Sequence, residues 1–391
     1  MKNFRIQLFC FLIAILFYTP LVSAQSSWIG RTIGDLPYLE YSDGMVRLGA
    51  DKMSFIDTNI RIEVIDSVEN RYKVKLSQNW EAYLPKRFVK RDFTEKIASE
   101  ILSGSWHLTA KDDNDILTVS LPERLPYRSY QLVDPNKIIV DVFGVTTNTT
   151  WITQLRKAKI VKNIYREQVD KDVYRIHIEL LGKQNWGYAI NYINKSLKIS
   201  VKHAPETKGI KNLFIAIDAG HGGSAKGAVS PNGTEEKVYN LKFALELEKY
   251  LHKKGVKNVY LTRREDIDIS TTDRVINLRK VNPDLLISLH LNASSNVNVK
   301  GVSTYYHHNG SRQLSQSILN EMLETGLEEF GLIGNFNFLL NSPIEYPNSL
   351  VEIAFLSNAE DEKIILDENF HKQTAEKIYK GIVRWLKDVQ D

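Results

Sequence analysis

Two histidines and one glutamate in this 391-residue chain stand where a protein could hold a metal ion. His221 follows the apolar run 213–217 at a glycine-rich turn, and His290 ends a second apolar run that begins at residue 285. Such short runs are typical of buried strands, and glycines let the chain turn close to a bound group. Glu236 stands just before an amphipathic helix. Two neutral imidazoles and one carboxylate are a known ligand set for catalytic zinc, with a fourth position left for water.

A fourth candidate, Glu352, is the only carboxylate in the apolar stretch 349–355. A buried, unpaired charge would be costly there. The cost is explained if Glu352 faces an attacking water, takes its proton and passes the proton to a leaving amine. Because zinc lowers the pKa of a coordinated water to about 7, hydrolysis of an unactivated amide becomes feasible at neutral pH. The residues therefore predict a zinc hydrolase with Glu352 as its base.

Four motifs carry a resemblance to a known family. They are Asp-Ala-Gly-His-Gly-Gly at 218–223, Asn-Gly-Thr-Glu-Glu-Lys at 232–237, Ser-Leu-His-Leu-Asn-Ala at 288–293 and Leu-Val-Glu-Ile-Ala-Phe-Leu-Ser-Asn at 350–358. In order and spacing they resemble the zinc-dependent N-acetylmuramoyl-L-alanine amidases, and the resemblance covers residues from about 212 to 386. Ala219 stands where the family more often has proline, which should alter the stiffness of the turn and leave the ligands in place.

The resemblance implies a site and a substrate. Zinc would be held by His221, Glu236 and His290, with Glu352 as the catalytic carboxylate. The substrate would be the amide bond between N-acetylmuramic acid and the L-alanine of the peptidoglycan stem peptide. Two alternatives stay open: a non-catalytic peptidoglycan-binding envelope protein, and a zinc hydrolase acting on another amide.

Less specific interpretations apply to several of these residues. A lone histidine at a strand end is more often a surface residue, so the prediction depends on the four positions together. Only the register of the motif separates Glu236 from Glu235 as the ligand. Asp218 is either a partner of a ligand histidine or a turn former, and we favour the turn.

The remaining histidines have weaker claims to a role. His307 and His308 follow the strand after His290, and we expect ordinary exposure in preference to a place on the rim of the cleft. His177 alternates with isoleucines, so we expect it to face solvent. Four others have no companion motif: His107, His203, His252 and His371.

The segment from 212 to 388 predicts an α/β domain, with a twisted, mostly parallel sheet flanked by helices. Val238, Leu241, Leu245 and Leu251 suggest the apolar face of a helix that ends at Gly255. The further expected elements are strands at 259–261, 285–289 and 302–306, and helices at 272–281 and 311–330. His221 and His290 would then lie just beyond the carboxyl ends of strands, where open α/β sheets bind ligands.

Two small all-β domains are expected ahead of this domain. Between residues 27 and 93, alternating segments at 61–65, 71–76 and 81–85 favour an antiparallel barrel that resembles the bacterial Src-homology-3-like domains. Between 104 and 203, alternation at 138–142, 174–180 and 197–201 favours a sandwich. The segment 132–141 resembles the AMIN domain, which implies targeting to peptidoglycan or to envelope proteins. Residues 204–211 are expected to be a linker.

Residues 1–24 have the pattern of a secretory signal peptide: basic residues, an apolar stretch and small residues before the expected cleavage site. The apolar stretch is shorter than the roughly 20 residues that span a bilayer. Cys10, the only cysteine, would be removed with it, which excludes disulfides from the mature chain. Together with the AMIN resemblance, export predicts a periplasmic protein, with secretion to the exterior as the alternative.

The formal net charge of +4, without a basic stripe interleaved with aromatics, does not indicate nucleic-acid binding. Some relatives carry a long helical insertion after the strand that follows the second histidine, and it plugs the zinc site. Here the segment 305–312 runs almost directly into the next expected helix. We therefore expect a domain that is active without an activator.

Overall fold

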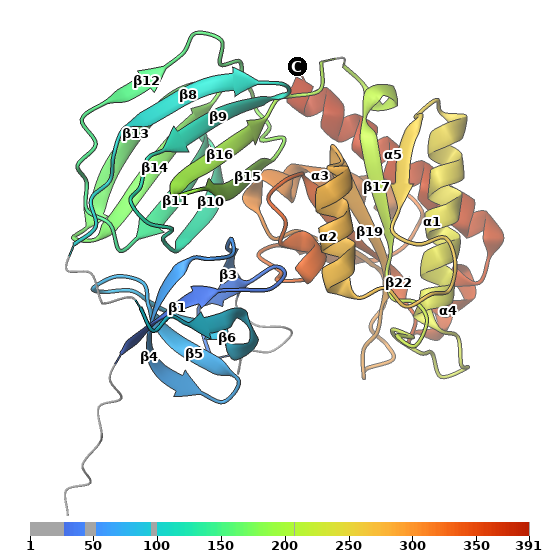
Figure 1. Ribbon diagram of the computed structural model, residues 1–391. Helices are drawn as coiled ribbons and strands as arrows, with labels where there is room; N and C mark the ends of the chain where they lie inside the picture. Colours follow the sequence, from blue (N-terminus) through green and yellow to red (C-terminus); the bar gives the residue numbers. More distant parts are fainter. Residues whose placement is uncertain (1–26, 44–51, 95–99, 207, 391) are drawn as a thin grey trace, which may run out of the picture.

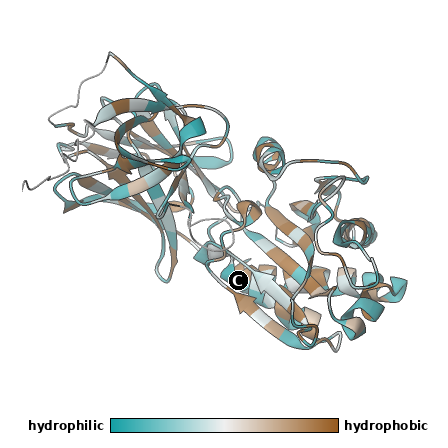
Figure 2. Cartoon of the chain, turned by 90° about the horizontal axis from the view of Figure 1, so that it is seen from below, coloured by the Kyte–Doolittle hydropathy of each residue, from teal (hydrophilic) through white to brown (hydrophobic). Residues whose placement is uncertain are grey.

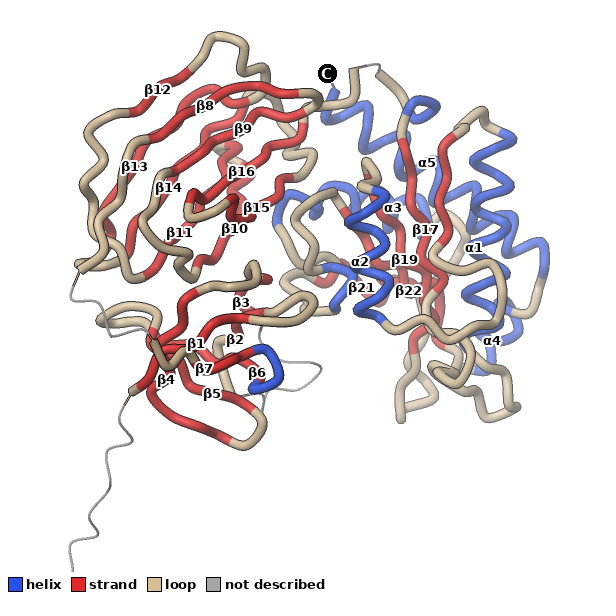
Figure 3. The backbone as a smooth tube through the Cα atoms, in the orientation of Figure 1, coloured by secondary structure: helices blue, strands red, loops and turns tan. Residues whose placement is uncertain are grey.

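The computed structural model describes residues 27–43, 52–94, 100–206 and 208–390. Figure 1 shows three bodies: a small β body, a larger β body above it, and a C-terminal body beside both. All α helices of the described residues lie in the C-terminal body; the short blue segment that Figure 3 shows in the small β body is a 3-10 helix. The predicted signal peptide and Cys10 lie outside the described residues. No helix in the described part of the chain is long and apolar enough to cross a membrane.

The first body is a seven-stranded antiparallel sheet in the order β3-β2-β6-β5-β4-β1-β7. Its elements are β1 Trp28–Thr32, β2 Tyr38–Glu40, β3 Lys52–Phe55, β4 Arg61–Val68, β5 Arg71–Lys75, β6 Glu81–Pro85, the 3-10 helix η1 Lys86–Phe88 and β7 Val89–Arg91. The three segments that alternation predicted as strands are β4, β5 and β6. Alternate residues of β4, such as Ile62 and Val64, face the core.

The second body consists of two sheets, ordered β10-β11-β14-β13 and β12-β8-β9-β16-β15. Its strands are β8 Trp106–Lys111, β9 Asn114–Val119, β10 Tyr127–Val133, β11 Asn136–Phe143, β12 Ile152–Gln154, β13 Val161–Asp170, β14 Val173–Leu180, β15 Tyr188–Ile193 and β16 Ser196–Lys202. Trp106 on one sheet meets Tyr174 on the other edge to face, with ring centroids 6.0 Å apart. Large apolar side chains from both sheets thus form the core that alternation predicted.

The C-terminal body has a six-stranded sheet in the order β18-β17-β19-β22-β20-β21. Only the β20–β22 pair is antiparallel. The elements are η2 Ile210–Asn212, β17 Phe214–Ala219, α1 Glu236–Lys253, β18 Asn258–Leu261, α2 Thr271–Val281, β19 Leu285–Asn292, β20 Val302–Tyr305, η3 Asn309–Ser311, α3 Arg312–Leu323, β21 Glu329–Ile333, η4 Leu339–Asn341, β22 Asn348–Phe355, α4 Ala359–Ile365 and α5 Glu368–Gln390. The predicted α/β fold with a mostly parallel sheet is confirmed.

Helices cover both faces of this sheet. Ala216 and Leu286 pack with α2 residues Val275 and Leu278 in one apolar cluster. The residues that alternate with them, such as Ile287, pack into the main core with α1, α3 and α5. Figure 2 shows hydrophobic residues concentrated on the central strands, as burial on both faces requires.

Two expectations about the helices are wrong. Val238 and Leu245, which we expected on the buried face of α1, are exposed. The buried face begins with the polar residues Glu236 and Asn240, so the pattern of apolar residues does not reveal where it lies. The helix expected at 311–330 ends at Leu323, because Gly326 adopts a left-handed φ of 89°. The chain beyond it forms β21, which pairs in parallel with β20.

Candidate metal and catalytic site

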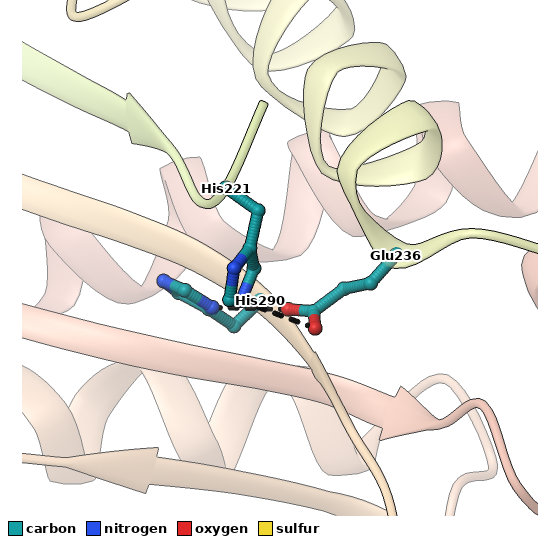
Figure 4. A group of neighbouring side chains, drawn as sticks. All are labelled: His221, Glu236 and His290. Carbon is teal, nitrogen blue, oxygen red and sulfur yellow. Dashed lines mark hydrogen bonds and ion pairs between the residues drawn. The ribbon is translucent and has the colours of Figure 1, made fainter. Parts of the chain in front are cut away.

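His221, Glu236 and His290 lie together, and their candidate ligand atoms are all within 4.8 Å of one another. Figure 4 shows His221 on the turn after β17, His290 on β19 and Glu236 at the start of α1, with the three side chains pointing toward one another. One Glu236 carboxylate oxygen is 3.2 Å from His221 Nε2, and the other is 3.0 Å from His290 Nδ1. His290 lies inside β19, two residues before its end, and not beyond the strand as expected. The three predicted ligands are therefore side by side.

The Glu236 carboxylate is held by the backbone as well as by the imidazoles. The Ala228 N–H donates to Oε2 at 2.7 Å, and the Leu291 N–H donates to Oε1 at 3.1 Å. The amide of Asn240, one helical turn further along α1, also donates to Oε1 at 3.0 Å. Burial alone would raise the pKa of Glu236, but the bonds to both histidines keep it far below its usual range. Glu235 points elsewhere: it pairs with Lys226 and Lys237.

The surroundings of His290 are set by burial and by the nearby carboxylates. Burial alone would lower the pKa of His290, but its hydrogen bond to Glu236 and the nearby negative charge raise it to about 9. Two imidazoles gathered around one buried carboxylate form a donor set that suits zinc. The residues present therefore fit the metal.

Glycines let the backbone approach these side chains. A Cβ on Gly220 would lie 2.3 Å from His290 Cε1, and one on Gly227 would lie 2.3 Å from a Glu236 oxygen. Real Cβ contacts do not reach such distances, so neither position accepts a side chain without movement. His221 itself adopts a left-handed φ of 62°, an unusual conformation for a residue with a side chain.

Two buried arginines hold the strained turn by its carbonyl groups. Arg274 on α2 donates to the Ala219 carbonyl at 2.7 Å and to the His221 carbonyl at 2.5 Å. Arg263, after β18, donates to the Ala219 and Gly220 carbonyls at 2.9 and 3.0 Å. The carbonyls that leave the sheet at the end of β17 thus have charged donors, which fixes the backbone that carries His221.

Asp218 is neither the turn former that we favoured nor a hydrogen-bonded partner of a histidine. It is fully buried inside β17 and forms an ion pair with Arg274, 2.7 Å apart. The hydroxyls of Thr262 and Ser288 donate to it as well, each at 2.7 Å. Burial would raise the pKa of Asp218, but the charges of Arg274 and His290 hold it below its usual value. Asp218 therefore supports the arginine that holds the turn.

Glu352 lies next to His290 across the sheet. In the parallel β19–β22 pairing His290 is opposite Glu352, so the two side chains rise from the same face of neighbouring strands, whose backbones are roughly 5 Å apart. Glu352 is only 7% exposed, and its Oε2 atom has no hydrogen-bond partner. Burial, with a smaller contribution from the Glu236 charge, raises the pKa of Glu352 to about 8. An unpartnered carboxylate beside the cluster is free to bind a proton from a molecule in the cleft.

The other histidines lie outside this cluster. His307 and His308 are partly buried, so the expectation of ordinary exposure is wrong. They line a cavity of about 480 Å³ between the three bodies. The expectation that His177 faces solvent is also wrong: its side chain is only 13% exposed and stacks on Tyr165, with ring centroids 4.3 Å apart. His203 contacts Asp115, and buried His371 contacts the Ile365 carbonyl.

Sequence reasoning missed Arg263, Arg274, Asn240 and Glu362. Glu362 on α4 is buried and accepts hydrogen bonds from Ser230, Asn232 and Thr234, which tie the loop before Glu236 to the end of the sheet. A buried arginine in the predicted helix 272–281 has no periodic signal of its own. Asn232 and Thr234 stand within a quoted motif, but only the structure supplies their partner.

The fold and the cluster define a class: an α/β domain with a mostly parallel sheet and a two-histidine, one-carboxylate site of the kind that holds a catalytic metal. Residues 215–384 match the model of the N-acetylmuramoyl-L-alanine amidase family, and residues 107–201 match that of the AMIN domain. The C-terminal domain therefore belongs to the N-acetylmuramoyl-L-alanine amidase family, and an AMIN domain precedes it. The family and enzyme class predicted from the motifs are confirmed.

Individual proteins are similar to large parts of this chain. The N-acetylmuramoyl-L-alanine amidase AmiC of Neisseria meningitidis serogroup B is 24% identical, over 69% of this chain and 86% of the relative. The probable cell wall amidase LytH of Staphylococcus epidermidis is 29% identical, over 56% of this chain and 73% of the relative. Among solved structures, an N-acetylmuramoyl-L-alanine amidase from Clostridium difficile 630 is 32% identical, with a TM-score of 0.43, covering 44% of this chain and 96% of that one.

Proposed function

We propose that this protein hydrolyses the amide bond between N-acetylmuramic acid and L-alanine in peptidoglycan, with zinc held by His221, Glu236 and His290. The observation that carries the proposal is the meeting of these three side chains beside the unpartnered carboxylate of Glu352. When bound, zinc would polarise the scissile carbonyl and lower the pKa of a water in the cleft.

The side chains divide the remaining work. Glu352 takes the proton of the attacking water and delivers it to the departing alanine nitrogen. The backbone N–H groups of Ala228 and Leu291 and the Asn240 amide keep the Glu236 carboxylate oriented between the imidazoles. Arg263 and Arg274 fix the turn that carries His221. The Glu236 carboxylate and the turn that carries His221 thus each have hydrogen-bond partners that hold them in place.

Digestion of purified peptidoglycan tests the proposal. The zinc-loaded protein should release free L-alanine amino termini without new reducing sugar ends, as identified by mass spectrometry of the products. New reducing ends would indicate cleavage of the glycan, and new termini elsewhere in the stem peptide would indicate another amide. Either result contradicts the assignment.

The two N-terminal bodies would direct the enzyme to its place in the cell envelope. We infer that the AMIN domain directs the enzyme to the wall or to envelope proteins, and that the first body is a Src-homology-3-like barrel at 27–93. Residues 1–24 would act as the signal peptide of a periplasmic protein. A reporter fused after residue 26 and recovered from the periplasmic fraction, with the first 24 residues removed, would support export. The non-catalytic alternative is disfavoured, because the site lacks none of its four residues.

A further inference from the structure

A groove runs between the first body and the C-terminal domain. Its volume is about 420 Å³. The barrel side is lined by the aromatic residues Tyr38, Phe55 and Phe88, and the catalytic side by Phe338 and Leu339. Tyr38 meets both other barrel rings edge to face, with centroids 6.2 Å from Phe55 and 5.6 Å from Phe88. Two bodies that are far apart in sequence therefore share one aromatic cleft.

The barrel is attached to the catalytic domain beside this groove. Leu36 packs against the apolar cluster that joins α2 to the sheet. The Arg279 guanidinium, near the end of α2, lies over the Phe55 ring at 5.0 Å. These contacts use an apolar side chain and a cation–π pair, which together give the barrel a defined position on the α2 face.

The groove begins next to the metal cluster. The Phe338 ring stacks on His290, nearly parallel at 12°, with centroids 6.4 Å apart. His290 and Glu352 rise from the face of the sheet that α2 covers in part, which is also the face that carries the barrel. Since an extended peptide advances about 3.3 Å per residue, a chain leaving the reacting amide would reach the groove within a few residues.

The charges in the groove favour an acidic peptide. Lys52 and Arg87 line it, against one carboxylate, Asp35. Both cations lie close to groove rings: Lys52 Nζ is 5.3 Å from the Tyr38 ring centre, and the Arg87 guanidinium carbon is 4.6 Å from that of Phe88. Cations beside aromatic walls suit a ligand that combines carboxylates with short aliphatic parts.

We propose that the barrel completes the substrate cleft of the amidase, and that this groove binds the carboxylate-bearing part of the peptidoglycan stem peptide beyond its L-alanine. The inference depends on the proposed function, because it names a subsite for the same substrate. It gives the first body a direct role in substrate selection, in addition to any role in location.

The test uses the full mature chain and two soluble substrates. One is an N-acetylmuramoyl tetrapeptide with free carboxylates, and the other is the same compound with those carboxylates amidated. Arg87→Gln should lower kcat/KM for the free acid about tenfold, as expected for loss of one charge-assisted hydrogen bond, and leave that for the amidated compound nearly unchanged. Asp35→Asn should shift the preference in the opposite direction.

Arg91→Gln is the matched control. Arg91 is also exposed on the barrel and also lies over an aromatic ring, 5.1 Å from that of Trp28, but it does not line the groove. It should leave both substrates unaffected. A direct binding measurement completes the set. The inactive Glu352→Gln variant should bind the free-acid tetrapeptide more tightly than the double variant that also carries the Arg87→Gln substitution.

Two results would overturn the subsite. One is equal kcat/KM of Arg87→Gln and the native enzyme for the free acid, and the other is an equal loss for both substrates. A different result marks failure of the proposed function itself: the native, zinc-loaded protein then cleaves neither tetrapeptide nor intact wall. The two failures are therefore distinguishable.

Discussion

Replacing Glu352 with Gln separates the proposed catalytic role of this residue from its effect on folding. The amide has nearly the shape of the carboxylate but cannot serve as a base. A positioned general base contributes about 10²- to 10⁴-fold to a rate, so kcat should fall by that order. The three candidate zinc ligands are unchanged, so zinc content measured by elemental analysis should stay the same.

The same substitution should raise the stability of the metal-free protein at neutral pH, although it lowers kcat. Burial raises the pKa of Glu352 from 4.5 to about 8 in the folded protein. Between these values the folded state binds a proton that the unfolded state has lost, so stability decreases as pH rises through this window and becomes level above it. At about 1.4 kcal/mol per pKa unit, burying Glu352 costs the folded protein on the order of 3–4 kcal/mol by pH 7.5, because the unfolded state has by then released the proton that the folded state keeps. The Gln side chain does not ionise and has no such cost.

The assay compares the two proteins in chelator, by denaturant unfolding at pH 5 and at pH 7.5. We expect the variant to match the native protein at pH 5 within about 1 kcal/mol and to be more stable at pH 7.5. The difference between the proteins is the relevant quantity, because all other titrating groups are common to both. Equal pH dependence of the two would refute the buried, unpaired state of Glu352, and full turnover by the variant would remove it from the mechanism.

Three further outcomes are expected. Arg274→Met leaves Asp218 buried without its cation, so unfolding free energy should fall by about 3–5 kcal/mol; adding Asp218→Asn should restore part of it, and a silent single variant would contradict the network. Gly220→Ala forces a methyl group against His290, so zinc affinity, measured by competition with a chromogenic chelator, should fall at least about tenfold. Because η3 and α3 follow β20 within a few residues, the purified chain should digest sacculi without an activator; activity that appears only after adding a partner protein would rule this out.

Sequence alone could predict the strands and single out the four candidate site residues for a physical reason. Parallel strands buried on both faces are short apolar runs, so a His or Glu in such a run is conspicuous, as His290 and Glu352 are. The turn at His221 is equally visible, because glycines mark it. These residues come together because their strands are neighbours in the sheet. The resemblance carried by the motifs implies this strand order, but the local alternation of apolar residues cannot reveal it.

The errors come from residues whose surroundings are set by tertiary packing. The apolar pattern misplaces the buried stripe of α1, because the first two members of that stripe are polar and face the cluster. Asp218 looks like a turn former because nothing near it in sequence reveals Arg274, 56 residues away. His307 and His308 look exposed in the sequence, since only the packing of three bodies against each other covers them.

The candidate reaction centre and the groove beside it divide the work of the protein between chemistry and substrate selection. The Glu236 carboxylate and the turn that carries His221 are held by hydrogen bonds from buried groups, so the cluster itself offers little scope for selecting among amides. Selection among substrates must then come from the surfaces around the cluster. In the groove, only the Phe338 ring separates His290 from the residues of the first body. If the barrel sets the preference for the stem peptide, exchanging Lys52 and Arg87 for neutral residues should change which peptidoglycan is cleaved without altering zinc content. The groove is built in part by a different body from the one that holds the reaction centre. Substrate preference can therefore vary while the chemistry is retained.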